Sequence, residues 1–116
     1  MAQLRDGPRA VEAAKKAIAL APNVGNFWNT LGVAYYRAGD WKIAATTLEK
    51  SIEVRAGGGS DDYFFLTMAH WQLGDKDKAR HWYAKAIEWM KRHNPDDEEL
   101  TRFRAAAKAL LGVTED

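Results

Sequence analysis

The sequence predicts an all-α protein, an α-solenoid of about six antiparallel helices built from repeated helical hairpins. Apolar residues recur at three- and four-residue spacing along nearly the whole chain, and the alternation typical of strands is absent. Two stretches of the chain also match each other at an offset of 35 residues. A fixed period of this size indicates a copied helical hairpin, in which each copy buries its apolar face against its neighbour.

The two copies agree at positions where neighbouring helices must approach closely. Ala34 and Ala69 are small there, as are Ala44 and Ala79, and the bulky residues beside them fill the remaining space. The matching residues are Trp28, Leu31, Ala34, Tyr36, Ala44, Leu48 and Ile52 in the first copy and Tyr63, Leu66, Ala69, Trp71, Ala79, Tyr83 and Ile87 in the second.

Turn residues mark the first three helices. Pro22 and Asn23 separate a helix near 8–21 from a second near 25–38. Gly39 can take the left-handed conformation that ends a helix, and Asp40 offers a carboxylate to cap a third helix near 41–56. This joint therefore predicts a tight antiparallel hairpin.

The same turn occurs again in the second copy. The glycine run at 57–59 predicts a flexible turn into a fourth helix near 61–73, and it is no phosphate loop because it follows a helix and lacks the Gly-Lys-Ser/Thr order. Gly74 and Asp75 then lead into a fifth helix near 76–92.

The sixth helix is expected near 95–111. Asn94 can cap it, Pro95 suits its first position, and the acidic run at 96–99 faces the positive end of the helix dipole. Its apolar residues form one stripe beside basic ones, as in a helix that caps the end of a repeat array. The stripe consists of Leu100, Phe103, Ala107, Leu110 and Leu111.

Composition excludes several classes of protein. The chain has 17 Lys and Arg against 16 Asp and Glu, a net charge of +1, which gives no electrostatic reason to expect nucleic acid or a membrane surface as partner. It has no cysteine, no secretory signal and no apolar run long enough to span a bilayer. We expect a soluble, cytoplasmic protein.

No pattern predicts catalysis, a cofactor or a metal. His70, His81 and His93 lack the four-residue spacing by which one helix face holds a metal ion. Neither Ser51 nor Ser60 lies in a nucleophile motif. We expect His70 to be a hydrogen-bonded, half-buried core residue rather than a base.

The motif Trp28-x-x-Leu31-Gly32-x-x-Tyr35, followed by Ala44, Leu48, Ser51 and Ile52, resembles a tetratricopeptide repeat. The second copy has Thr67 in place of the family's glycine and His70 in place of its tyrosine. The resemblance implies a single domain over 1–116, with the second helix of a truncated repeat at 8–22 whose first helix is outside this chain. Full repeats then follow at 25–56 and 60–93, with a capping helix at 95–111.

In this family the first helix of each pair lines a concave groove, so the resemblance implies a peptide or protein ligand there. Some members of the family clamp the C-terminal carboxylate of a partner with lysine, asparagine and arginine side chains in this groove. Here Val33, Phe64 and Phe65 stand where such cations or amides would be needed. We therefore expect a peptide that inserts apolar side chains and is oriented by Asn26 and Asn29. The alternative is that the aromatic residues pack against neighbouring helices. The partner-binding candidates are Asn26, Asn29, Val33, Tyr36, Arg37, Phe64, Met68, Trp71 and Gln72, with Asp61 at the position equivalent to Asn26.

Two other functions stay open. The first is an assembly element that stacks on another repeat, or on a second copy of the chain as a homo-oligomer, through an open N-terminal edge. This edge is formed by Val11, Ala14, Ile18 and Ala21. The second is the regulatory tail of a bacterial signalling enzyme such as a kinase.

Overall fold

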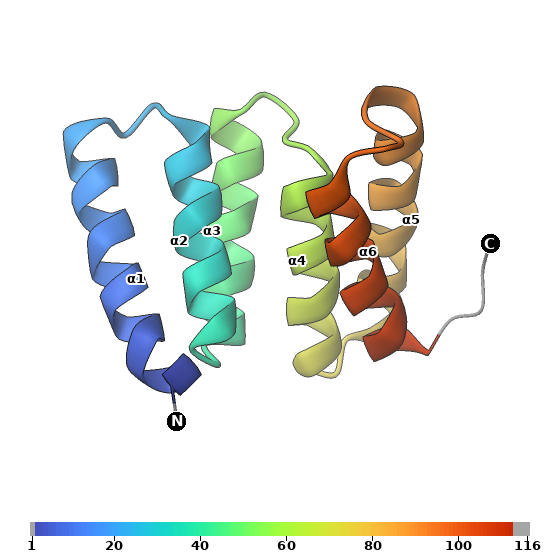
Figure 1. Ribbon diagram of the computed structural model, residues 1–116, viewed down its shortest axis with the longest axis horizontal. Helices are drawn as coiled ribbons and strands as arrows, with labels where there is room; N and C mark the ends of the chain where they lie inside the picture. Colours follow the sequence, from blue (N-terminus) through green and yellow to red (C-terminus); the bar gives the residue numbers. More distant parts are fainter. Residues whose placement is uncertain (1, 113–116) are drawn as a thin grey trace.

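The computed structural model describes the backbone of residues 2–112 and the side chains of residues 8–112. All regular structure in this part is helical, and successive helices run alternately up and down (Figure 1). The helices are α1 (Ala2–Leu20), α2 (Gly25–Arg37), α3 (Trp41–Val54), α4 (Ser60–Gln72), α5 (Lys76–His93) and α6 (Glu98–Leu111). The all-α hairpin repeat expected from the sequence is therefore confirmed.

The helices form two hairpins with an additional helix at each end. The pairs α2 with α3 and α4 with α5 pack most closely, and α3 joins the hairpins by packing against α4. The first helix, α1, packs against α2. The last helix, α6, packs mainly against α4 and only slightly against α5, and it lies in front of both in Figure 1.

Glycine ends the first helix of each hairpin, as expected. The φ angles of Gly39 and Gly74 are 87° and 86°, a left-handed conformation that glycine adopts at little cost. In the first turn the amide of Asp40 donates to the carbonyl of Tyr35 at 2.9 Å. The repeated sequence thus produces the same tight turn twice.

The expected helix caps are confirmed at one joint of three. Asp75 accepts a hydrogen bond from the amide of Lys78 at 3.2 Å. The Asp40 side chain makes no such bond, so that prediction is wrong, and the first turn of α3 is held by the Asp40 carbonyl instead. The prediction for α6 is also wrong, because Asp97 rather than Asn94 caps it, accepting from the Leu100 amide at 2.8 Å.

The first helix begins at Ala2, six residues before the expected start. Pro8 therefore lies inside α1, where its missing N–H removes one backbone hydrogen bond without ending the helix. Residues 2–7, for which the sequence predicted no helix, thus extend α1 at its start.

The core depends on small residues at the helix contacts. Ala44, Ala69, Ala79 and Ala86 are fully buried. A Cβ added at Gly32 would lie 2.6 Å from Cγ of Leu48, so no larger residue fits there. The main buried cluster joins α3, α4, α5 and α6 and is built mostly on α4, with Leu48, Tyr63, Phe64, Phe65, Leu66, Met68, Tyr83, Met90, Leu100 and Leu111.

We predict that Ala79→Leu lowers the free energy of unfolding by about 1–3 kcal/mol, because the added methylene and methyl groups have no space at this contact. Ala84→Leu on the exposed face of the same helix is the matched control and should change it little. Urea denaturation followed by circular dichroism measures both. Equal stability of the two variants would contradict the packing described here.

Candidate functional site

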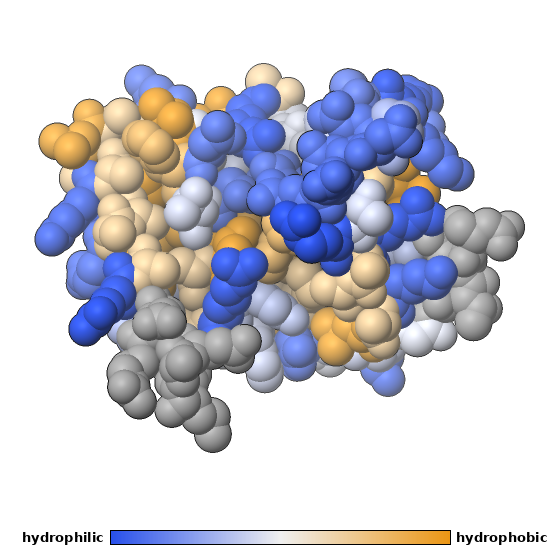
Figure 2. Space-filling model, in the orientation of Figure 1, coloured by the Kyte–Doolittle hydropathy of each residue, from blue (hydrophilic) through white to orange (hydrophobic). Residues whose placement is uncertain are grey.

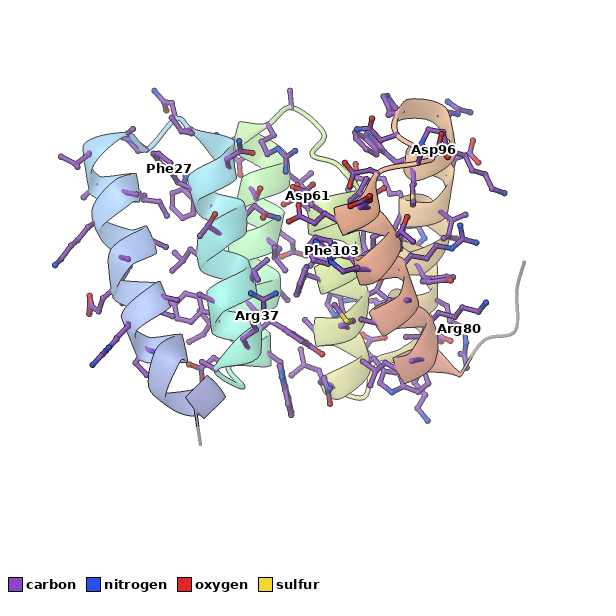
Figure 3. The ribbon with its side chains drawn as sticks, viewed as in Figure 1. Phe27, Arg37, Asp61, Arg80, Asp96 and Phe103 are labelled. Atoms are coloured by element: carbon purple, nitrogen blue, oxygen red, sulfur yellow. The ribbon has the colours of Figure 1, made fainter. Side chains whose placement is uncertain are left out.

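An open cleft of about 880 Å³ lies on the face formed by α1, α2, α4 and α6. From α2 it is lined by Asn26, Asn29, Thr30, Val33, Ala34 and Arg37. The other helices contribute Ala10, Asp61, Glu99 and Phe103. Figure 3 shows Asp61, Phe103 and Arg37 in that order down the cleft, and Figure 2 shows apolar residues over α1 and hydrophilic ones over the first turns of α6.

A buried carboxylate lies beside the upper end of the cleft. Asp62 is fully buried, and its Oδ1 accepts a hydrogen bond from Nδ2 of Asn29 at 2.9 Å. Its Oδ2 accepts from Nη1 of Arg55 at 2.8 Å and from the amide of Gly59 at 3.3 Å. Nη1 of Arg55 also lies 3.0 Å from both carboxylate oxygens of Asp61. One guanidinium therefore connects two carboxylates.

Burial sets the ionisation of this carboxylate. Desolvation raises the pKa of Asp62, and the neighbouring charge of Asp61 adds to the rise. The hydrogen bonds from Asn29 and Ser51 and the charge of Arg55 lower it in part. The charged form of Asp62 therefore depends on these partners.

Gly25 makes room for the arginine. A Cβ at Gly25 would lie 1.9 Å from Cγ and 2.7 Å from Cδ of Arg55, so the stem of Arg55 passes directly over the glycine backbone. The carbonyl of Gly25 also accepts a hydrogen bond from the Ser51 hydroxyl at 3.3 Å. The start of α2 and the end of α3 are thus fixed to the same polar cluster.

Four of the nine predicted partner-binding residues line the cleft. Asn26 and Arg37 are exposed, and Asn29 and Val33 are half-buried. Asn29 uses one amide hydrogen to hold Asp62, which fixes the orientation of the rest of its amide. The α2 part of the predicted surface is therefore present and open.

Two of the predicted residues belong to the core instead. Phe64 is 0% exposed and Met68 is 5% exposed, so their assignment to an open groove is wrong. Phe64 lies edge-on to Tyr83, with ring centroids 6.2 Å apart. The reason is that both α5 and α6 pack against α4: Tyr83 of α5 lies against Phe64, and the ring of Phe103 of α6 lies 4.9 Å from that of Phe65.

The three remaining predicted residues are half-buried and lie outside the cleft lining. Nε2 of Gln72 donates to the hydroxyl of Tyr36 at 3.3 Å, and that ring lies edge-on to Phe65. Nζ of Lys76 lies 5.0 Å from the ring centroid of Trp71. Their role in binding stays a prediction.

Sequence reasoning did not assign five of the lining residues to a binding site. Glu99 and Phe103 are four residues apart and so share one face of α6, but they were expected to serve as a helix start and a capping stripe. Ala10 and Ala34 were expected to serve in the packing of the repeats, and Thr30 carries no motif. Only the position of α6 beside α2 and α4 brings these residues together.

The N-terminal edge expected to stack on another repeat faces inward. Val11 and Ala14 are buried against Leu31 and Ala34 of α2, so their assignment to an open edge is wrong. Ile18 is partly buried against the same cluster. Among the described side chains of α1, Leu20 is the large apolar residue that is exposed, at 88%.

His70 is buried where α4 faces α3 and α5, rather than half-buried as expected. Its Nε2 has no hydrogen-bond partner among the described residues, so the expected hydrogen bond to this atom is not found. Desolvation lowers the pKa of His70, the nearby charge of Lys78 lowers it further, and Asp75 and Glu49 oppose the change. The imidazole is held in its neutral form.

No helix in the described part of the chain is both long and apolar enough to cross a membrane. Among the same residues, no three histidine or carboxylate side chains converge to form a metal site.

The family model described as tetratricopeptide repeat matches residues 23–92. The match covers both central hairpins, from the residues before α2 to the end of α5. Proteins of this family typically use the repeat as a non-catalytic module for protein–protein interaction. No curated protein matches the chain.

We predict that Gly25→Ala destabilises the protein by about 1–3 kcal/mol, because the new Cβ displaces Arg55 from Asp62. In an Arg55→Ala background the clashes with Cγ and Cδ are removed and only the contact with Cβ at 3.3 Å remains, so the same substitution should cost much less than in the wild type. A double-mutant cycle by urea denaturation measures this coupling. Equal effects in both backgrounds would show that Arg55 does not occupy the space above Gly25.

We predict that His70 makes the protein sensitive to acid. Its folded-state pKa lies below the ordinary value of 6.5, so its contribution to stability is fully present above that pH and is lost as the pH falls from 6.5 toward the folded-state pKa. His70→Phe should flatten the dependence of unfolding free energy on pH below 6.5, whereas His81→Gln, at an exposed position, should not. Identical pH profiles for wild type and His70→Phe would contradict the placement of His70.

Proposed function

Because the chain belongs to the tetratricopeptide repeat family, we propose that it binds a peptide or protein segment in the cleft between α1, α2, α4 and α6, without catalysis or cofactor. The observation that carries the proposal is the cleft itself, which is open and lined by both amide and apolar side chains. Mixed linings of this kind suit a peptide, whose backbone needs hydrogen-bond partners and whose side chains need apolar contact.

The polar and apolar lining residues are suited to different parts of a peptide. The amides of Asn26 and Asn29 are positioned for polar groups of a peptide backbone, and Asn29 is held in place by Asp62. Val33 and Phe103 offer apolar surface deeper in the cleft. The expected contribution of Phe64 and Met68 is dropped because both are buried.

The other functions have less support. An assembly element would need a surface on α1, but Val11 and Ala14 are used within the molecule. If the chain is the regulatory tail of a larger enzyme, it can still bind a peptide, and this alternative predicts no different role for the cleft. We propose a cytoplasmic location, which the absence of cysteine allows because the chain has no disulfide that a reducing compartment would break. The net charge of +1 gives no electrostatic reason to expect nucleic acid as the partner.

Thr30→Trp tests the proposal, because a tryptophan at this exposed lining position fills the cleft without entering the core. Thr46→Trp on α3 is the matched control, since Thr46 is also exposed and its hydroxyl likewise donates to the carbonyl four residues earlier. Peptides are first selected from a random library on the wild-type chain, and their dissociation constants are then measured for each variant.

We predict that Thr30→Trp weakens binding of the selected peptides by about tenfold or more, while Thr46→Trp leaves it unchanged. Circular dichroism should show wild-type helix content for both. Failure to select any peptide, or equal affinity of the two variants, would contradict the proposal.

A further inference from the structure

The two ends of the cleft carry opposite charge. Asp61 lines the upper end and Arg37 the lower end (Figure 3). Glu99 lines the cleft from the first turn of α6, which begins beside the upper end (Figure 1). Val33 and Phe103 lie among them as apolar lining residues. The cleft thus offers an acidic end, an apolar middle and a basic end.

The acidic end keeps an excess of negative charge despite Arg55. That guanidinium is shared between Asp61, at 3.0 Å, and Asp62, at 2.8 Å. Glu99 is exposed and contributes another carboxylate to the same end. Even with Asp62 protonated, two carboxylates face one cation, so this end attracts a cationic side chain.

Among the described residues, Arg37 is the cation that lines the basic end of the cleft, and it has no carboxylate partner. Arg37 is exposed, and no carboxylate of residues 8–112 lies within salt-bridge distance of it. Its guanidinium carbon lies 5.8 Å from the ring centroid of Phe65 on α4, a cation–π contact that restrains the side chain. A planar guanidinium held in this way is suited to a carboxylate.

Helix geometry gives the separation of the two ends. Asp61 and Asn26 occupy equivalent positions in the two repeats, each as the second residue of its helix. The two residues therefore lie at the same level along α4 and α2. Eleven residues of helix separate Asn26 from Arg37, which corresponds to about 16 Å at 1.5 Å per residue. An extended peptide covers this distance in about five residues at roughly 3.3 Å each.

We propose that the cleft binds an extended segment with a lysine or arginine at Asp61 and Glu99, an apolar side chain at Val33 and Phe103, and an aspartate or glutamate at Arg37. The two charged residues of the ligand are about five positions apart. This inference rests on the proposed function and specifies the ligand's chemistry.

The probes are octapeptides with acetylated and amidated ends, which removes their terminal charges. The first has lysine at its second position, leucine at its fourth, glutamate at its seventh, and serine or glycine elsewhere. A second exchanges the lysine and glutamate, because the segment can enter in either direction. A third keeps the composition but places the two charges side by side, and a fourth replaces the glutamate by lysine.

Chemical-shift titration of the full chain measures the affinities. We expect one of the first two peptides to bind more tightly than the third. Arg37→Glu should weaken that binding by about tenfold, because the new glutamate repels the glutamate of the peptide. The same variant should strengthen binding of the fourth peptide, because the new glutamate attracts its lysine. Arg80→Glu, which makes the same charge change on the exposed face of α5, should do neither.

Three outcomes would overturn the inference. The variants Arg37→Glu and Arg80→Glu could act alike, the third peptide could bind as well as the first two, or none of the four could bind. If library selection still yields peptides that Thr30→Trp rejects, only the charge order is wrong. If selection also fails, the proposed function fails with it.

Discussion

The packing of α6 across α4 is the contact on which the rest of the molecule depends. Together with α5, it covers the aromatic and aliphatic residues of α4, so Phe64 and Met68 lie in the core instead of on a binding surface. The same placement brings Phe103 and Glu99 opposite α2. The capping helix therefore both completes the core and forms one wall of the cleft.

The polar cluster around Arg55 holds the two hairpins in register. It joins the end of α3 to the first turn of α4 through Asp62, and it reaches the start of α2 through Asn29 and Gly25. A buried carboxylate is costly unless its partners are complete, so small displacements of one hairpin against the other are unfavourable. Stability at the joint and charge at the acidic end of the cleft thus share the same residues.

Local features of the fold could be predicted from the sequence, whereas contacts between distant elements could not. Gly39, Gly74 and the buried alanines follow from the repeat, because each acts within one turn or one helix contact. Periodicity also identified the apolar stripe of α6, but it does not say which neighbour covers that stripe. For the same reason the burial of Phe64 was only an alternative at the level of sequence, and the pairing of Arg55 with Asp62 was not predicted.

The accessibility of single cysteines tests the central contact most directly, because the chain contains no cysteine of its own. Met68→Cys places a thiol beneath α6, and Asn26→Cys places one at the open cleft. With α6 packed across α4, the thiol at Met68 should react with a maleimide reagent far more slowly than the thiol at Asn26, and the two should react equally in urea. Equal rates in the folded protein would show that this face of α4 is open.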